Sequence, residues 1–201
     1  MTRRRHALAL TAMLATTGTT GGAQDAQGFV VRGMGSLSCQ ILVDALEGEQ
    51  SNDAAARLVA WLSGYASHAN RADGTVRDVL PYSNVNELAT VVARVCASNT
   101  EAQVEAVTAS VLATLAPLAV TEQDELTELN RGEAVVRIRP SVLQAIQERL
   151  IARELLPAGS ADGVYGEQTA EALASFQEQA NLPTTGLPDA WTVFVLQAAG
   201  T

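Results

Sequence analysis

The segment Asp-Gly-Val-Tyr-Gly-Glu-Gln-Thr, at positions 162–169, constrains the fold of this chain more than any other stretch. It separates two segments in which apolar residues recur at the spacing of a helix face. The spaced residues are Val142, Ile146 and Leu150 before the segment, and Thr169, Ala172, Leu173, Phe176 and Ala180 after its start. Asp162-Gly163 predicts a turn, because glycine adopts positive φ without a clash at Cβ. Gly166 is predicted as the N-cap of the second helix.

A third, shorter helix is predicted close to the end of the chain. Asn181-Leu182-Pro183 ends the second helix, and Asp189 can cap a last helix that runs through Leu196. Residues 141–199 are therefore expected to hold three helices joined by turns.

Together these residues resemble the peptidoglycan-binding module that is appended to many cell-wall enzymes. The residues that carry the resemblance are Ile146, Gln147, Leu150, Asp162, Gly163, Tyr165, Gly166, Thr169, Ala172, Leu173, Phe176, Gln177, Leu182, Thr185, Gly186, Asp189, Thr192 and Leu196. One departure lies after the first helix, where the family has a glycine and residues 152–156 read Ala-Arg-Glu-Leu-Leu. The resemblance implies a three-helix domain over residues 141–199 and peptidoglycan as its ligand.

Five side chains of this module are candidates for contacting the ligand. They are Asp162, Tyr165, Thr169, Gln177 and Thr185. Asp162 has a structural alternative, because an Asp side chain can cap its own turn. Tyr165 has another, because aromatic side chains in small domains often belong to the core.

Charge limits what the chain can bind. The formal net charge is −9 at pH 7, and the chain contains no lysine. From Ser141 onward, Arg149 and Arg153 stand against seven acidic residues, a balance of −5. Such a chain lacks the basic surface that nucleic acids or anionic lipids require. Peptidoglycan stem peptides also carry carboxylates, so binding must come from a shaped groove and directed hydrogen bonds.

The first 23 residues resemble a signal peptide. Arg3–His6 form a charged start, and Ala7–Ala15 form an apolar stretch that is too short to span a bilayer. Gly21-Gly22-Ala23 supplies small residues for cleavage after Ala23. We therefore expect an exported, periplasmic protein, with Sec or twin-Arg export left open and no membrane span.

Residues 35–117 predict a small helical bundle. Apolar stripes indicate four helices, and Pro117 ends the last one. Asn84 is predicted to cap the third helix in a capping box with Glu87, and Thr100 to cap the fourth in a box with Gln103.

Cys39 and Cys96 lie in the first and third predicted helices. An even pair of cysteines in an exported chain predicts a disulfide. The alternative is two unpaired buried thiols, which an oxidising compartment disfavours.

Residues 35–115 also resemble the HdeA-type periplasmic acid-stress proteins. The residues that carry this weaker resemblance are Cys39, Gln40, Trp61, Gly64, Tyr65, Asn70, Cys96 and Asn99. Thr100 stands where that family has a proline. The resemblance implies a helical domain with one disulfide, and unfolding or partner proteins as clients in acid.

Residues 118–140 are expected to be an acidic linker between the two domains. The acidic run from Glu122 to Glu128 predicts a solvated helix or tether. Residues 133–139 alternate weakly and predict a short strand or an extended approach to the module.

Catalytic chemistry has little support in the sequence. After removal of the leader, His68 is the one histidine, and a zinc site needs several ligands. We expect no catalytic residue, no metal and no cofactor. The alternatives are a cell-wall-modifying enzyme with an unrecognised site, or a module that docks another protein instead of peptidoglycan.

Overall fold

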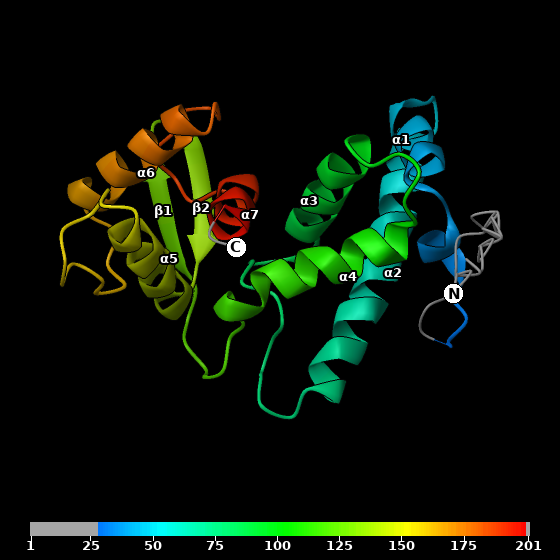
Figure 1. Ribbon diagram of the computed structural model, residues 1–201, viewed down its shortest axis with the longest axis horizontal. Coiled ribbons are helices and arrows are strands. Elements are labelled where there is room, and N and C mark those ends of the chain that lie inside the picture. The colour runs from blue at the N-terminus through cyan, green and yellow to red at the C-terminus, as the bar shows by residue number, and fades with distance from the viewer. Residues whose placement is uncertain (1–27, 200–201) are drawn as a thin grey trace, which may run out of the picture. The chain divides into compact units, whose positions relative to one another are not determined.

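The computed structural model describes residues 28–199, which form a mainly helical fold (Figure 1). In order, its elements are η1 (Gly33–Ser36), α1 (Cys39–Glu47), α2 (Ser51–Ala72), α3 (Val85–Ala97), α4 (Val104–Leu115), η2 (Ala116–Leu118), β1 (Thr127–Arg131), β2 (Ala134–Ile138), α5 (Pro140–Ala152), α6 (Glu167–Gln179) and α7 (Ala190–Ala198). The predicted signal peptide, residues 1–23, lies outside the described residues. No helix within residues 28–199 has the length and apolarity that crossing a membrane requires.

Helices α1 to α4 form the predicted bundle, and the predicted disulfide is confirmed. Cys39 at the start of α1 is bonded to Cys96 near the end of α3, and both residues are fully buried. The link joins helices whose cysteines are 57 positions apart in the sequence.

Trp61 and Tyr65 connect α2 to other parts of the bundle. The Trp61 ring lies against η1, where a Cβ on Gly35 would come within 2.1 Å of it. Its Nε1 donates a hydrogen bond to the carbonyl of Arg32 at 2.9 Å. The Tyr65 hydroxyl donates to Glu105 of α4 at 3.0 Å. Burial, followed by this hydrogen bond to Glu105, raises the pKa of Tyr65 to about 12.

The two predicted capping boxes have different outcomes. Asn84 caps α3 as predicted, because its side chain accepts a hydrogen bond from the backbone N–H of Asn86. Glu87 does not complete the predicted box, since it accepts from the backbone N–H of Ser83 instead of that of Asn84. The prediction for α4 is wrong, since this helix begins at Val104 and its N-cap is Gln103. The preceding residues pair with the start of α1 instead. The N–H groups of Cys39 and Gln40 donate to the carbonyls of Ala102 and Thr100 at 2.8 and 2.9 Å.

A β-hairpin occupies part of the segment that was predicted as an acidic linker. Strands β1 and β2 pair antiparallel, with Leu129 opposite Val136. The acidic residues 122–125 that precede the hairpin are not helical. The alternation in residues 133–139 corresponds to β2, whose last residue, Ile138, is buried.

Helices α5, α6 and α7 form the predicted three-helix arrangement. Gly166 is the N-cap of α6, and Asp189 caps α7. The Asp189 carboxylate accepts hydrogen bonds from the backbone N–H groups of Trp191 and Thr192 at 3.0 and 3.1 Å. The predicted helix starts are therefore confirmed in this half.

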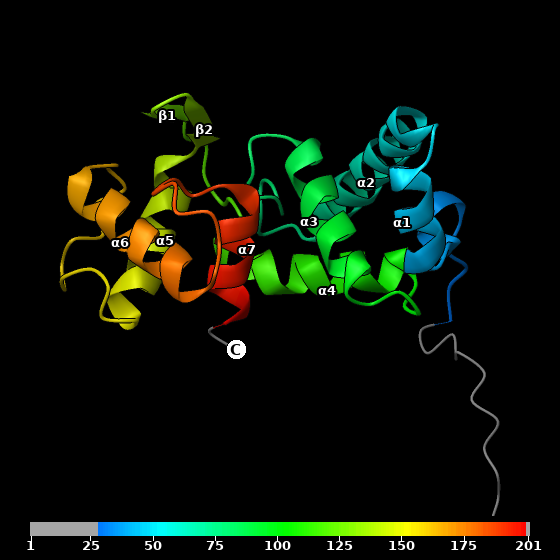
Figure 2. The same ribbon diagram turned by 90° about the horizontal axis from the view of Figure 1, so that it is seen from above.

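The buried side chains of both halves belong to one hydrophobic core. Helix α7 packs against α3 and α4 as well as α5. Both views show it between the bundle of α1 to α4 and the other two C-terminal helices, α5 and α6 (Figures 1 and 2). The Tyr82 hydroxyl donates to the carbonyl of Ala190 at 3.1 Å, and the Arg94 guanidinium lies 5.3 Å from the centre of the Trp191 ring. From Val31 onward the chain is thus one compact unit.

Candidate functional site

The turn at Asp162 is held by hydrogen bonds from two directions. The Asp162 carboxylate accepts from the backbone N–H of Val164 at 2.9 Å and from Gln147 Nε2 at 3.1 Å. These two bonds hold the pKa of Asp162 below its usual value, and the bond from the backbone N–H has the larger effect. Gly163 adopts φ +71°, and a Cβ there would lie 2.7 Å from the carbonyl oxygen of Pro140. The turn therefore needs glycine for conformation and for space.

Gln147 of α5 fastens this turn to the helix. Its Oε1 accepts from the N–H of Gly163 at 2.8 Å, while Nε2 also donates to the carbonyl of Val164 and to Thr169 Oγ1. Gln147 is 1% exposed, so its amide serves the fold.

Gln177 of α6 fastens a second glycine turn in the same way. Its Oε1 accepts from the N–H of Gly186 at 2.8 Å, and Nε2 donates to the carbonyl of Leu187 at 2.9 Å. The hydroxyls of Thr185 and Thr192 accept from the same Nε2. Gln177 is fully buried.

The five candidate ligand residues occupy different environments. Thr169 and Gln177 are buried with their polar atoms bonded inside the protein, so they present no surface to a ligand. Asp162 and Thr185 are exposed. Tyr165 is half-buried, and its hydroxyl donates to the carbonyl of Gly186 at 2.7 Å, which ties the two turns together. Sequence alone indicates polar side chains but not which way they point.

A groove with a cavity volume of about 400 Å³ brings Asp162 and Tyr165 together. Strand β1 forms one wall and residues 162–165 form the other, while Ile138 of β2 and Pro140 and Leu143 of α5 form the rest. The exposed Val164 lies on its rim, and Leu129 supplies a buried apolar contact. Strand β1 pairs only with β2 among residues 28–199, so no strand occupies its other edge. Sequence reasoning missed this wall, because β1 lies in the segment predicted as a linker.

An ion pair lies beside Tyr165. Arg131, the last residue of β1, contacts Glu167 with 3.1 Å between Nη2 and Oε1. The hydrogen bond to Glu167 raises the pKa of Arg131. Burial raises the pKa of Tyr165, while Arg131 acts in the opposite direction. The pair joins the hairpin to the start of α6.

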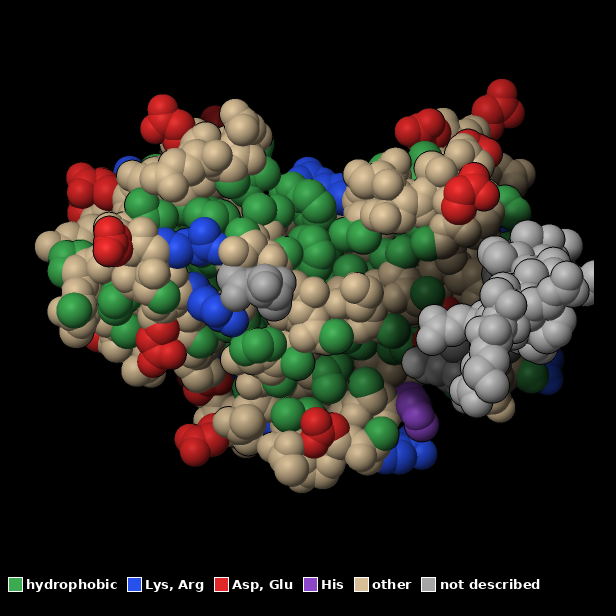
Figure 3. Space-filling view, viewed as in Figure 1, with side chains coloured by type: hydrophobic (Ala, Val, Ile, Leu, Met, Phe, Trp, Pro, Cys, Tyr) green, Lys and Arg blue, Asp and Glu red, His purple; other side chains and the backbone are tan. Residues whose placement is uncertain are grey.

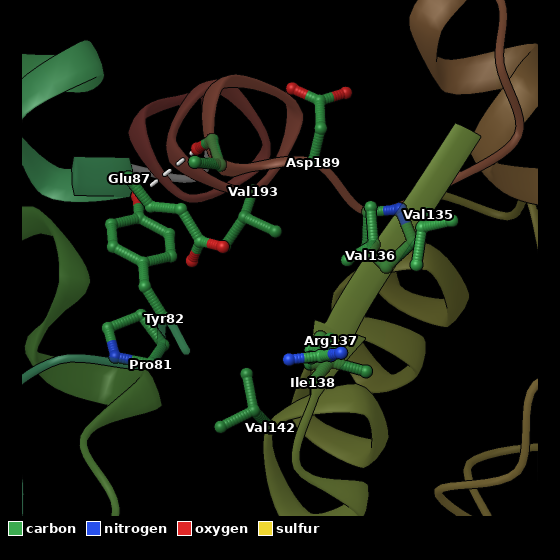
Figure 4. A pocket seen from close by; sticks show the side chains of 12 residues that line it. Pro81, Tyr82, Glu87, Val135, Val136, Arg137, Ile138, Val142, Asp189 and Val193 are labelled. Atoms are coloured by element: carbon green, nitrogen blue, oxygen red, sulfur yellow. Dashed lines mark hydrogen bonds between the residues drawn. The ribbon is translucent and has the colours of Figure 1, made fainter. Parts of the chain in front are cut away.

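A second, smaller cavity of about 170 Å³ lies on the other side of the hairpin (Figure 4). It is lined by β2, by Tyr82 and Glu87 of the bundle, and by Asp189 and Val193 at the start of α7. Both carboxylates already serve the fold, since Glu87 accepts from Ser83 and Asp189 caps α7. Burial raises the pKa of Tyr82, and the charges of Glu87 and Asp189 add to this effect.

Within residues 28–199 no three His, Cys, Asp or Glu side chains are grouped as a metal site would require. His68 is exposed on α2. The groove itself offers apolar side chains and hydrogen-bonding groups to a ligand.

Comparison with known protein families finds a match in the C-terminal part of the chain. The model of a family described as "Putative peptidoglycan binding domain" matches residues 139–196. These residues, which comprise α5, α6, most of α7 and the two glutamine-fastened turns, form a peptidoglycan-binding-like module. The match leaves the bundle and the hairpin outside, so β1 adds a wall that the matched region does not contain.

Searches among curated proteins and among solved structures found no match. The resemblance of residues 35–115 to acid-stress proteins stays a prediction.

Proposed function

We propose that this chain is a non-enzymatic protein that associates with the cell wall through the groove of its C-terminal module. The observation that carries the proposal is the family match over residues 139–196, together with a groove at the edge of that module. Peptidoglycan is the ligand class that the match supports. The exported location expected from residues 1–23 is part of the proposal, and the Cys39–Cys96 disulfide supports it because such bonds persist in oxidising compartments.

The groove suits an extended stem peptide that lies along β1. The edge of β1 that has no strand partner among residues 28–199 offers backbone donors and acceptors, and Val164 and Leu129 offer apolar contact. Because the Asp162 carboxylate lines the groove without an ion pair among residues 28–199, whereas Glu128 pairs with Arg137, this carboxylate favours the amine of a stem peptide over its carboxylate at this position. We expect weak affinity, since the acidic module does not attract an acidic polymer over long distance.

Sedimentation with purified sacculi tests the proposal. The full chain should co-sediment without releasing soluble muropeptides. Val164→Glu should weaken co-sedimentation by roughly fivefold or more, because a charge replaces an apolar groove contact. Ile41→Glu is the matched control, since Ile41 is similarly exposed but lies on α1 of the bundle.

The other functions predict different results. Release of muropeptides would mean a wall-modifying enzyme. Absence of co-sedimentation would favour a module that docks another protein. Equal effects of Val164→Glu and Ile41→Glu would rule out the groove.

We further propose that the helical bundle binds unfolding or partner proteins, in acid in particular. The support is the resemblance of its sequence to acid-stress proteins. In the folded bundle Val107, Val111 and Leu115 are buried, so client binding through this stripe requires the bundle to open. Titration with an apolar-surface dye and a client aggregation assay at about pH 3, below the ordinary carboxyl pKa values, test this function. No dye response and no suppression of aggregation would contradict it.

A further inference from the structure

Arg149 and Arg153 carry all the positive charge of residues 141–199. They are four positions apart at the end of α5, so their side chains lie on one face. Arg149 Nε donates to Gln197 Oε1 at 3.0 Å, and Arg153 Nη2 donates to the carbonyl of Leu196 at 3.5 Å. The Arg153 guanidinium also lies 5.5 Å from the centre of the Phe176 ring. Both guanidiniums are therefore oriented by the fold.

These contacts orient the two guanidiniums without neutralising them. Within residues 28–199, neither Arg149 nor Arg153 has an ion pair with a carboxylate, and the adjacent Glu148 and Glu154 are exposed. The arginines that do pair with acids are Arg57, Arg131, Arg137 and Arg139. Each guanidinium has five N–H donors, so most donors of Arg149 and Arg153 are left over for a ligand.

Gln197 of α7, which accepts from Arg149, carries an unsatisfied donor beside it. It is 1% exposed, and its Nε2 is buried without an acceptor among the described residues. A buried donor without an acceptor is costly and calls for an explanation. On the face shown in Figure 3, basic side chains lie side by side over the region of α5 and α7, and acidic side chains surround them on the same half of the molecule. Donors and positive charge thus meet on an otherwise acidic module, which is the arrangement that binds a carboxylate.

We propose that Arg149 and Arg153 form a carboxylate-binding site, that Gln197 positions Arg149, and that the ligand is the free carboxylate of a peptidoglycan stem peptide. The choice of a stem peptide as the ligand rests on the proposed function, whereas the inference that the two arginines bind a carboxylate rests on their geometry alone. The site lies at the opposite end of α5 from the groove, which reaches Leu143. The groove, which has acidic side chains, and the arginine site at the far end of α5 would then bind different parts of the same ligand.

Binding of a stem pentapeptide to the full chain, measured by calorimetry, tests the site. The probe is the peptide with a free C-terminal carboxylate, compared with the same peptide as a C-terminal amide and with acetate alone. We expect the free acid to bind roughly tenfold or more tightly than the amide, since the amide loses the charge-assisted hydrogen bonds. Arg149→Gln/Arg153→Gln should abolish this preference. Arg57→Gln/Arg71→Gln makes the same change in net charge on α2, away from the site, and should keep it.

Each other outcome overturns a stated part of the proposal. Equal binding of acid and amide by the unaltered protein, a comparison that no variant's folding affects, rules out the carboxylate site. Equal loss in both double variants means a general effect of net charge. Acetate that binds as tightly as the peptide rules out the stem peptide as the source. If the chain fails to sediment with sacculi but still prefers the acid, the proposed function fails while the site stands.

Discussion

Two glutamines, Gln147 and Gln177, decide the shape of the surface around the groove. Each projects from a helix, and its Oε1 accepts a hydrogen bond from a glycine N–H at 2.8 Å. Its Nε2 donates hydrogen bonds to a loop carbonyl and to a threonine hydroxyl. Tyr165 then joins the two turns through the carbonyl of Gly186. Single buried amides therefore hold the loops that would meet a ligand.

Gln177→Leu should lower the free energy of unfolding by about 2–4 kcal/mol, because buried groups such as the N–H of Gly186 lose their partner. The measurement is urea unfolding followed by circular dichroism. Gln179→Leu is the matched control, since Gln179 is an exposed residue of the same helix and surface substitutions change stability by about 0.5 kcal/mol or less. Equal effects of the two substitutions would contradict the role assigned to Gln177.

The turn at Asp162 should also lose stability in acid. The pKa of Asp162 is lowered in the folded state, so its contribution is present above the unfolded pKa of about 4 and is lost as pH falls through the folded pKa. Asp162→Asn keeps an acceptor for the N–H of Val164 but removes the titration. We therefore expect the difference in unfolding free energy between Asp162→Asn and the unaltered protein to shrink below about pH 4. A difference that stays constant from pH 7 to pH 2 would contradict this linkage.

At the scale of elements, the short helix η1 is held in place by the aromatic side chain of Trp61. Gly35 is buried against that ring, and the ring's Nε1 bonds the backbone at Arg32. This contact explains why a tryptophan stands on the face of α2 toward η1. It also makes Gly35 a site where size matters more than backbone conformation.

Gly35→Ala should destabilise the protein by about 1–3 kcal/mol or more, because the added methyl group overlaps a ring that has to move. Gly64→Ala should instead stabilise the protein. Gly64 lies within α2, where an added Cβ would meet no atom within 4 Å, and alanine in a helix is favoured over glycine by about 0.5–1 kcal/mol. Thermal unfolding of the two variants measures both effects. A stable Gly35→Ala protein would mean that Trp61 packs elsewhere.

At the scale of the whole molecule, the bundle and the module share buried surface. Helix α7 of the module contacts α3 and α4, and Tyr82 of the bundle bonds the first residue of α7. Two halves that bury apolar side chains against each other are expected to unfold together. The wall-binding module should therefore depend on the bundle for part of its stability.

Reduction of the Cys39–Cys96 disulfide tests this dependence. For cysteines 57 positions apart, reduction should lower the free energy of unfolding by about 4 kcal/mol in the chain-entropy model. Trp61 reports on the bundle and Trp191 on α7, so their fluorescence can be followed separately in Trp191→Phe and Trp61→Phe proteins. Both unfolding midpoints should fall together. A shift of the Trp61 transition alone would mean that the halves unfold independently.

The amino-acid sequence by itself determined the features that depend on neighbouring residues. The turn at Asp162-Gly163, the caps Gly166 and Asp189 and the three helices of the module were predicted from local pattern, and the disulfide was predicted from the presence of two cysteines. Glycine conformation, capping and helix periodicity act over a few positions, and two cysteines leave one possible intramolecular pairing.

Tertiary structure decided what depends on contacts between distant segments. Helix α4 starts at Val104, later than predicted, because residues 100–102 pair with the start of α1. Thr169 and Gln177 became interior residues because the turns fold over them, and β1 became a wall of the groove because the hairpin lies beside residues 162–165. The direction of a polar side chain is set by which surfaces pack together, and local spacing does not contain that information.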